Sequence, residues 1–248
     1  MKYKNILLTG STGRLGKAML EQSSFLTPSS KILDITKPST IENFFKKNNI
    51  DAVIHCAAMA RMKECHENPS KAIETNVMGT ANLVSEVIKK ETKSGKAIRF
   101  VHISTDGVYE GKTGNYSEND STMPYNIYGW TKLGAECSVK LLKNHCIIRT
   151  SFFDPENIKF NESATDAYTS KVTVGYLAKA VLTMLNNDFT GTINIGKERK
   201  SDYEIYKRYK PSLRPCKFKD IQKKVLFPMA KDSSMNINKW KAIENKPQ

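Results

Sequence analysis

Residues 4–16 read Lys4-Asn5-Ile6-Leu7-Leu8-Thr9-Gly10-Ser11-Thr12-Gly13-Arg14-Leu15-Gly16. The apolar run predicts a strand, and the residues from Gly16 to Gln22 predict a helix. The glycines have the spacing G-x-x-G-x-x-G, which lets the backbone turn tightly and lets a pyrophosphate approach the N–H groups of a helix N-terminus. The stretch therefore predicts a dinucleotide-binding loop; the alternative is a plain glycine turn. Its candidate binding residues are Gly10, Ser11, Thr12, Gly13, Arg14, Leu15 and Gly16.

Strands and helices alternate along the rest of the chain. Apolar runs predict strands at 25–26, 51–56, 98–103, 146–149 and 191–195, and helical spacing predicts helices over 71–90, 128–142 and 174–185. This alternation is typical of βαβ units. We therefore expect an α/β protein with a Rossmann-type doubly wound parallel sheet. An NAD(P)-binding Rossmann domain would span residues 1–150, and a small C-terminal substrate subdomain, not an independent domain, would span residues 151–248.

The composition argues against several classes of protein. Of the 248 residues, 39% are hydrophobic, and their spread along the chain argues against disorder. No apolar run approaches the ~20 residues of a membrane-spanning helix, so we expect no membrane partner. The net charge of +14 comes from scattered lysines. We interpret it as a solvated surface and expect no nucleic-acid partner.

Cysteine and histidine positions give little sign of further chemistry. The five cysteines are widely spaced and include no C-x-x-C pair, so we expect reduced thiols, no metal site and a cytoplasmic protein. His55 and His102 fall on predicted strands. We interpret both as core or sheet-end residues rather than catalytic ones.

The segment after the short strand at 25–26 bears on the choice of cofactor. An acidic residue there would hold the ribose of NAD and repel the extra phosphate of NADP. This chain has Thr27-Pro28-Ser29-Ser30-Lys31 instead, whose hydroxyls and ammonium suit a phosphate. The sequence therefore favours NADP(H), with NAD(H) left open; the alternative is a solvated turn.

Tyr128 and Lys132 lie four residues apart on a predicted helix and therefore share one face. A free phenol titrates near ~10, and a nearby ammonium would lower that pKa and favour proton transfer. Tyr128 could then exchange a proton with a substrate oxygen while a nicotinamide exchanges a hydride with the adjoining carbon. Ser104-Thr105 ends a predicted strand, so a hydroxyl there could contact the same oxygen.

Together these residues resemble the extended short-chain dehydrogenase/reductase family, and within it the dTDP-4-dehydrorhamnose reductase branch. The similarity covers most of the first 150 residues and returns in patches later. Besides the glycine loop and the Tyr128/Lys132 pair, the segments that carry it are Leu33-Asp34-Ile35-Thr36, residues 51–60, Glu74-Thr75-Asn76-Val77, Ser104-Thr105-Asp106-Gly107-Val108-Tyr109-Glu110-Gly111 and Ile148-Arg149-Thr150-Ser151-Phe152.

The resemblance implies a role for each matching residue. Thr105, Tyr128 and Lys132 would be catalytic: a hydroxyl, a proton donor, and a tuner that also binds the cofactor ribose. The further cofactor-binding residues would be Asp34, Ile35, Ala57, Ala58, Met59 and Asn76. The implied activity is reduction of a nucleotide-linked 4-keto-6-deoxy sugar by NADP(H), as in deoxysugar and polysaccharide biosynthesis.

Departures from the branch leave alternatives open. Related sugar-nucleotide dehydratases carry a glutamate where this chain has Gly107, so elimination of water is disfavoured. The segment 152–171 is shorter than in the family, where it helps to bind the nucleotide. A 4-epimerase, or a non-catalytic cofactor-binding regulatory subunit like that of methionine adenosyltransferase, remains possible by resemblance. The sugar, the nucleotide and a homodimeric state are not fixed by the sequence.

Overall fold

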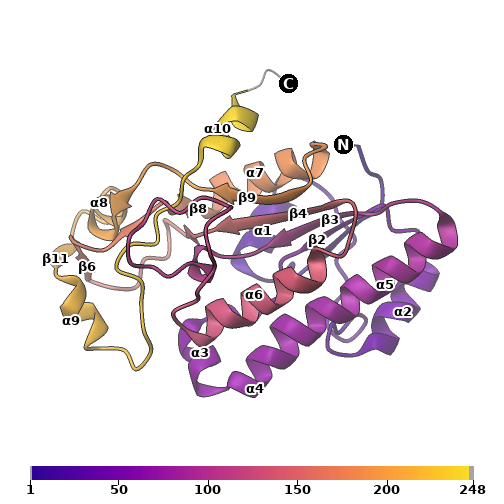
Figure 1. Ribbon diagram of the computed structural model, residues 1–248, viewed down its shortest axis with the longest axis horizontal. Helices are drawn as coiled ribbons and strands as arrows, with labels where there is room; N and C mark the ends of the chain where they lie inside the picture. Colours follow the sequence, from indigo (N-terminus) through magenta and orange to yellow (C-terminus); the bar gives the residue numbers. More distant parts are fainter. Residues whose placement is uncertain (1, 246–248) are drawn as a thin grey trace.

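A parallel five-stranded sheet forms the centre of the computed structural model, which describes residues 2–245 (Figure 1). Its strand order is β1-β2-β3-β4-β9. The strands are β1 (Ile6–Thr9), β2 (Ala52–His55), β3 (Arg99–Ile103), β4 (His145–Thr150) and β9 (Gly191–Ile195). The predicted α/β class with a Rossmann-like parallel sheet is confirmed.

Helices cover both faces of the sheet (Figure 1). One face is covered by α1 (Arg14–Leu20) and α7 (Val174–Asn186). The other is covered by α2 (Pro38–Lys47), α5 (Gly79–Ser94) and α6 (Ile127–Val139). Within residues 2–245, none of the helices combines the length and the apolar character needed to cross a bilayer.

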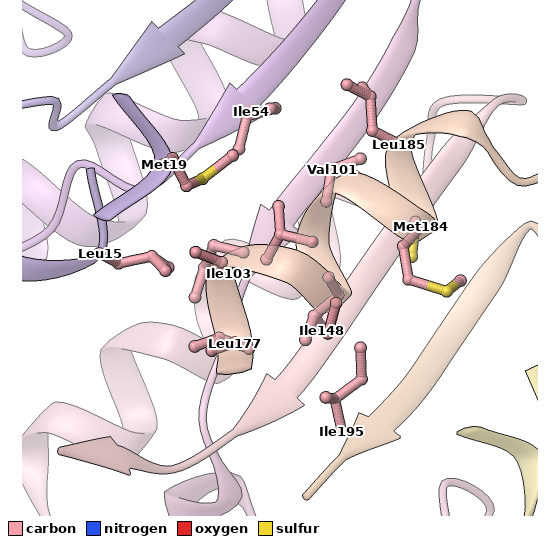
Figure 2. Packing of buried hydrophobic residues seen from close by; sticks show 14 of the residues in the cluster. Leu15, Met19, Ile54, Val101, Ile103, Ile148, Leu177, Met184, Leu185 and Ile195 are labelled. Atoms are coloured by element: carbon pink, nitrogen blue, oxygen red, sulfur yellow. The ribbon is translucent and has the colours of Figure 1, made fainter. Parts of the chain in front are cut away.

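The alternation of side chains along each strand explains the two layers. In β1, Ile6 and Leu8 pack on the α1/α7 side, whereas Leu7 packs on the opposite side. Figure 2 shows the first of these cores, in which Leu177 of α7 lies near Ile103 of β3. All five of these side chains are buried, so both faces of the sheet are fully covered, as parallel sheets require.

The crevice of the fold lies beside β1. On one side β1 pairs with β2, and on the other it forms a parallel bridge from Leu7 to Leu26. The chain therefore crosses from one side of β1 to the other between Leu26 and β2. Ligands of open α/β sheets bind at such a crossing, outside the carboxyl ends of the strands.

The helix predicted over 71–90 is divided into three parts. A short α4 (Pro69–Ala72) continues into the π-helix η1 (Ile73–Met78) and then into α5. The extra residue per turn in a π-helix is unfavourable and is found mostly at functional sites. Here η1 contains Asn76, one of the predicted cofactor-binding residues.

The C-terminal part of the chain contributes to both the sheet and a small subdomain. Because β9 pairs with β4 and α7 packs in the sheet core, residue 150 does not mark an end of the sheet. The subdomain elements beside it are β5 (Phe152–Phe153), β6 (Glu162–Ala164), β7 (Tyr168–Thr169), β8 (Val172–Thr173), β10 (Lys200–Ser201), β11 (Arg214–Cys216), α8 (Asp202–Lys207), α9 (Phe218–Gln222) and α10 (Asn238–Glu244). The remaining short helices are α3 (Met62–Glu67) and the 3₁₀ turn η2 (Asp106–Val108).

Candidate active site

The glycine loop packs so closely on itself and on the end of β2 that a side chain at Gly10 or Gly16 would collide with backbone atoms. Gly10 has a φ of +72°, and a Cβ there would lie 2.6 Å from the backbone nitrogen of Ala57. A Cβ on Gly16 would lie 2.4 Å from the carbonyl oxygen of Gly10. Only glycine fits both positions. The loop is therefore a close backbone cradle between β1, α1 and the end of β2.

A cavity of about 860 Å³ opens above this cradle. Its lining joins three of the predicted segments: the glycine loop at 9–13, the hydroxyl-rich segment at 27–30 and the segment at 33–37. Cys56, Ala57 and Ala58 complete it on the β2 side. These predicted segments thus border a single cavity, whereas its lining does not include the other predicted site residues, which are Arg14, Leu15, Gly16, Met59, Asn76, Thr105, Tyr128 and Lys132. Lys71, which sequence reasoning missed, also lines it.

Asp34 and Ile35 are held by local contacts. The Asp34 carboxylate accepts hydrogen bonds from the backbone N–H and the hydroxyl of Thr36, at 3.0 and 2.7 Å. The Thr36 hydroxyl holds the pKa of Asp34 below its ordinary value, so the carboxylate is ionised. The side-chain amide of Asn82 donates to the Ile35 carbonyl at 3.1 Å. This turn is rigid where it borders the cavity.

Asn76 contacts protein groups on every side. Its carbonyl accepts from the backbone N–H of Met59 at 2.7 Å, and its amide donates to the Met59 carbonyl at 3.1 Å and to the Thr131 hydroxyl at 2.9 Å. It is buried. Asn76 therefore connects the loop after β2 to α6, the helix that carries Tyr128. That Asn76 also binds the cofactor stays a prediction.

Thr105 and Tyr128 meet at the carboxyl end of β3. The Thr105 hydroxyl accepts from the backbone N–H of Gly107 at 3.0 Å and donates to Asp106 at 3.1 Å. The Thr105 hydroxyl also acts to lower the pKa of the Tyr128 hydroxyl. Gly129 brings α6 close to this strand end, because a Cβ there would lie 2.2 Å from the Gly107 carbonyl oxygen.

The pKa of Tyr128 moves in the direction opposite to the expected one. Burial raises it, and the nearby Asp106 carboxylate adds to the rise. The expected lowering by Lys132 is absent because the Lys132 ammonium lies against His102, 3.3 Å from its Nε2. Tyr128 is therefore a neutral phenol at neutral pH, which is the form that gives a proton away.

Lys132 is buried beside two histidines. Burial lowers its pKa to about 8, so it stays mostly charged at neutral pH. His55 stacks near His102, with ring centroids 5.3 Å apart. Burial and the Lys132 charge lower the pKa of His55 to about 3 and that of His102 well below its ordinary value. Both histidines are core residues, as predicted, and both are neutral.

Hydrogen bonds fix the tautomer of His55. The Thr80 hydroxyl donates its proton to the backbone carbonyl of Asn76 at 2.7 Å. It must therefore accept from Nε2 of His55, which lies 2.9 Å away. The Thr9 hydroxyl then donates to Nδ1 at 2.7 Å. This chain of contacts ties the end of β1, through β2, to the π-helix.

A buried ion pair supports the base of α6. Glu136, one turn after Lys132, pairs with Arg149 of β4 at 2.7 Å, and Ser104 donates to the same carboxylate at 2.6 Å. Arg149 continues to the Tyr109 hydroxyl at 3.0 Å. Sequence reasoning did not assign Glu136, although a glutamate on the apolar face of a predicted helix was an available signal.

A second cavity, of about 260 Å³, lies between the subdomain elements. Lys171 borders it and donates to Asp202 and to the Tyr206 hydroxyl, both at 2.9 Å. Burial opposes its charge, but Asp202 and Tyr206 outweigh burial and raise the Lys171 pKa. Phe160, Phe218, Met229 and Ala230 are among its other lining residues. The shortened segment after β4 therefore still builds a pocket with aromatic walls.

Comparison with known proteins identifies the family. The model of the RmlD substrate-binding domain matches residues 4–162, more than half of the chain. The chain belongs to this family. Its resemblance to the dTDP-4-dehydrorhamnose reductase branch of the extended short-chain dehydrogenases/reductases is thereby confirmed.

Individual relatives agree with this assignment. The chain is 30% identical over 157 residues to dTDP-4-dehydrorhamnose reductase of Mycolicibacterium smegmatis, covering 60% of this chain and 46% of that protein. It is 28% identical over 184 residues to methionine adenosyltransferase 2 subunit beta of Mus musculus, covering 68% of this chain and 53% of that one. The chain thus spans about half the length of these curated relatives.

A solved structure shares the whole fold. The dTDP-4-dehydrorhamnose reductase of Bacillus anthracis, solved in complex with NADP, matches with a TM-score of 0.86 at 23% identity. The match covers 100% of this chain and 95% of that one. The fold, including the small subdomain, is therefore that of the RmlD substrate-binding-domain family.

Proposed function

We propose that this chain is an NADP(H)-dependent reductase of a nucleotide-linked 4-keto-6-deoxy sugar. The observation that carries the proposal is the close packing of the first turn of α6, which carries Tyr128, on the segment that follows Thr105 at the carboxyl end of β3: a Cβ on Gly129 would lie 2.2 Å from the Gly107 carbonyl oxygen. Two hydroxyls at that position suit a carbonyl oxygen, because Tyr128 can donate to it and Thr105, which donates to Asp106 in this structure, can turn its hydroxyl proton toward it. The similarity to dTDP-4-dehydrorhamnose reductase of Mycolicibacterium smegmatis supports this class of substrate.

The residues around the larger cavity fit a dinucleotide. The cradle formed by Gly10 and Gly16 excludes side chains where a pyrophosphate must approach the backbone. Ser29 and Ser30 border the cavity, and no acidic residue occurs between 27 and 31. This favours NADP(H) over NAD(H). Titration of the protein with NADPH and NADH tests the preference, and tighter NADH binding would reverse it.

NADPH, when bound, supplies a hydride to the sugar carbon at position 4. Tyr128 gives its phenolic proton to the oxygen on that carbon, so the carbonyl becomes an alcohol and Tyr128 regains a proton from solvent. Thr105 holds the same oxygen by a hydrogen bond. Lys132, whose ammonium contacts His102 in this structure, would bind the cofactor ribose rather than act on the phenol.

The contacts of Asp106 argue against a dehydratase. Its carboxylate accepts from Thr105 and, at 2.7 Å, from Ser233. Burial raises the pKa of Asp106. The neighbouring position is Gly107, which offers no second acid. Elimination of water needs both an acid and a base at this edge of the sheet, whereas reduction needs a single proton donor, which Tyr128 supplies.

Spectrophotometric assay of purified protein tests the activity. NADPH consumption is measured with a panel of nucleotide-linked 4-keto-6-deoxy sugars, first with dTDP-4-dehydrorhamnose. Tyr128→Phe should lower kcat by about 100-fold or more, and Tyr3→Phe, remote from the site, serves as the control. An inactive wild type, or an unimpaired Tyr128→Phe, overturns the proposal. A 4-epimerase would interconvert two sugars without net consumption of NADPH.

A regulatory subunit is the second candidate. The similarity to methionine adenosyltransferase 2 subunit beta covers 68% of this chain, more than the similarity to the reductase covers. A binding module does not need Thr105, Tyr128 and Lys132 together, and this favours the reductase. Capture of a stoichiometric methionine adenosyltransferase, together with no reduction of any sugar tested, would favour the regulatory role. A homodimeric state stays a prediction for either function.

A further inference from the structure

Tyr125 lies just before the helix that carries Tyr128, and its backbone is well anchored. Asn126 caps α6 by accepting from the backbone N–H of Gly129 at 2.9 Å. The same side chain donates to the Pro228 carbonyl at 3.3 Å. The turn that holds Tyr125 is therefore fixed both to α6 and to the segment whose next residues, 229 and 230, border the smaller cavity.

Two glycines make room for the Tyr125 side chain. A Cβ on Gly111 would lie 2.9 Å from Cδ1 and 3.0 Å from Cε1 of Tyr125, so the ring lies flat against that backbone. A Cβ on Gly107 would lie 3.6 Å from the Tyr125 hydroxyl oxygen and 3.3 Å from the Thr105 Oγ1. One small space is thus bordered by the Tyr125 hydroxyl and by the Thr105 hydroxyl.

The Tyr125 hydroxyl makes no hydrogen bond to another group among residues 2–245, whereas three other tyrosine hydroxyls each have a protein partner. Tyr109 donates to Asn194 at 2.8 Å, Tyr176 donates to Glu244 at 2.6 Å, and Tyr206 accepts from Lys171 at 2.9 Å. Tyr125 is half-buried, so its hydroxyl is free to bond to a ligand or to water. Burial raises the pKa of Tyr125, so it keeps its proton and can donate.

The surroundings place this hydroxyl between the reacting pair and the smaller cavity. The hydroxyl lies near Gly107 at the end of β3, and the ring lies near Gly111, where an added Cβ would also lie 2.6 Å from the Ala230 Cβ at the wall of that cavity. A sugar whose 4-oxygen contacts Thr105 and Tyr128 has two neighbouring ring carbons. In a 6-deoxy sugar, carbon 5 carries a methyl group, whereas carbon 3 carries a hydroxyl.

We propose that Tyr125 is a specificity-determining residue that hydrogen-bonds to the 3-hydroxyl of the bound sugar from the space beside Gly107. The proposal rests on the proposed function, because that function supplies the sugar. A site built to bind a hydroxyl discriminates strongly against a ligand without it, since the protein group is then left unpaired. Tyr125 would therefore distinguish sugars by their chemistry at carbon 3.

Equilibrium binding tests this proposal separately from turnover. Wild type, Tyr125→Phe and the control Tyr3→Phe are titrated, with NADP⁺ present, with dTDP, with a dTDP-6-deoxyhexose and with its 3-deoxy analogue. We expect Tyr125→Phe to bind the dTDP-6-deoxyhexose about tenfold more weakly, the loss of one hydrogen bond, and to bind dTDP and the 3-deoxy analogue as wild type does. Its Tm should be unchanged, because the hydroxyl has no partner in the protein.

The possible outcomes separate the two proposals. If Tyr125→Phe loses affinity equally for dTDP and for the dTDP-6-deoxyhexose, or loses affinity for neither, the role of Tyr125 is overturned. The expected sugar-specific loss in a protein that never consumes NADPH supports Tyr125 as a sugar contact while overturning the reductase. A wild type that binds neither dTDP nor the dTDP-6-deoxyhexose overturns both.

Discussion

The ammonium nitrogen of Lys132 lies 3.3 Å from Nε2 of His102, and both side chains are buried. The histidine is neutral, so Nε2 accepts from the ammonium and the ring proton is on Nδ1, which has no hydrogen-bond partner among residues 2–245. The Nδ1 proton of His102 is thus left without a hydrogen bond while Nε2 binds Lys132, the lysine of the proposed catalytic set. This makes His102 a positioning residue for Lys132.

The alkaline limit of activity should therefore depend on His102. Burial lowers the pKa of Lys132 to about 8, so turnover that needs the ammonium is present below that pH and is lost as pH rises through it. His102→Leu removes the acceptor that favours the charged form and should move the fall in kcat/KM to lower pH. His102→Gln keeps an acceptor and should shift it less. Identical pH profiles for wild type and His102→Leu would exclude this role.

His55 predicts how stability depends on pH. Its pKa is about 3 in the folded protein against an ordinary value of 6.5, so the unfolded chain binds the extra proton between these values. Stability should fall as pH drops from 6.5 toward 3, by about 2 kcal/mol between pH 6.5 and pH 5 from this residue. His55→Asn, which cannot titrate and can still accept from Thr9, should lose about 2 kcal/mol less of its free energy of unfolding over this pH range, as measured by urea unfolding. Equal losses in the two proteins would contradict the assignment.

The glycine cradle can be tested by cofactor binding alone. Gly10→Ala places a methyl group 2.6 Å from the Ala57 nitrogen at a φ of +72°, so the loop must move and NADPH affinity should fall by at least about tenfold. Gly175→Ala is the matched control, because a Cβ there meets nothing within 4 Å. Fluorescence titration with NADPH measures both. Equal affinity of Gly10→Ala and Gly175→Ala would show that the cofactor does not use this loop.

The Glu136–Arg149 pair predicts a large effect on stability. Glu136→Gln leaves the buried Arg149 charge without its partner and should lower the free energy of unfolding by about 3–5 kcal/mol. Replacing both residues by leucine should restore part of this loss. Glu67→Gln, in an exposed pair with Lys63, should change it by less than about 1 kcal/mol. Denaturant unfolding measures all three, and a near-wild-type Glu136→Gln would refute the role of the pair.

The sequence predicted the strands of the central sheet better than it predicted the helices around that sheet. The strand 191–195 and the helix from residue 174 follow directly from apolar periodicity. The helix α2 was missed although its sequence carries a signal: Ile41, Phe44 and Phe45 have the i, i+3, i+4 spacing of an amphipathic helix, and Pro38 stands at its start. The division of the predicted 71–90 helix was also missed, because a π-helix is stabilised by long-range contacts such as those of Asn76 with Met59.

Motifs located the candidate site, but they could not give the directions of its side chains. The glycine loop and the segments at 27–30 and 33–37 do border one cavity. The sequence placed Tyr128 and Lys132 on one helical face, yet their burial and the direction of Lys132 toward His102 depend on how β3 and α6 pack. Tyr125 carried no motif at all. The position of its ring depends on tertiary contacts with Gly107 and Gly111, which precede Tyr125 by more than ten residues in the sequence.

The most direct measurement of the central claim is transfer of deuterium from NADPH labelled at the reactive carbon of its nicotinamide. Wild type should place the label on carbon 4 of the nucleotide-linked sugar, as mass spectrometry of the product would show. Tyr128→Phe should bind the labelled cofactor equally well and transfer about 100-fold less. Label that never reaches the sugar with wild type, or that reaches it equally fast without the Tyr128 hydroxyl, would contradict the account.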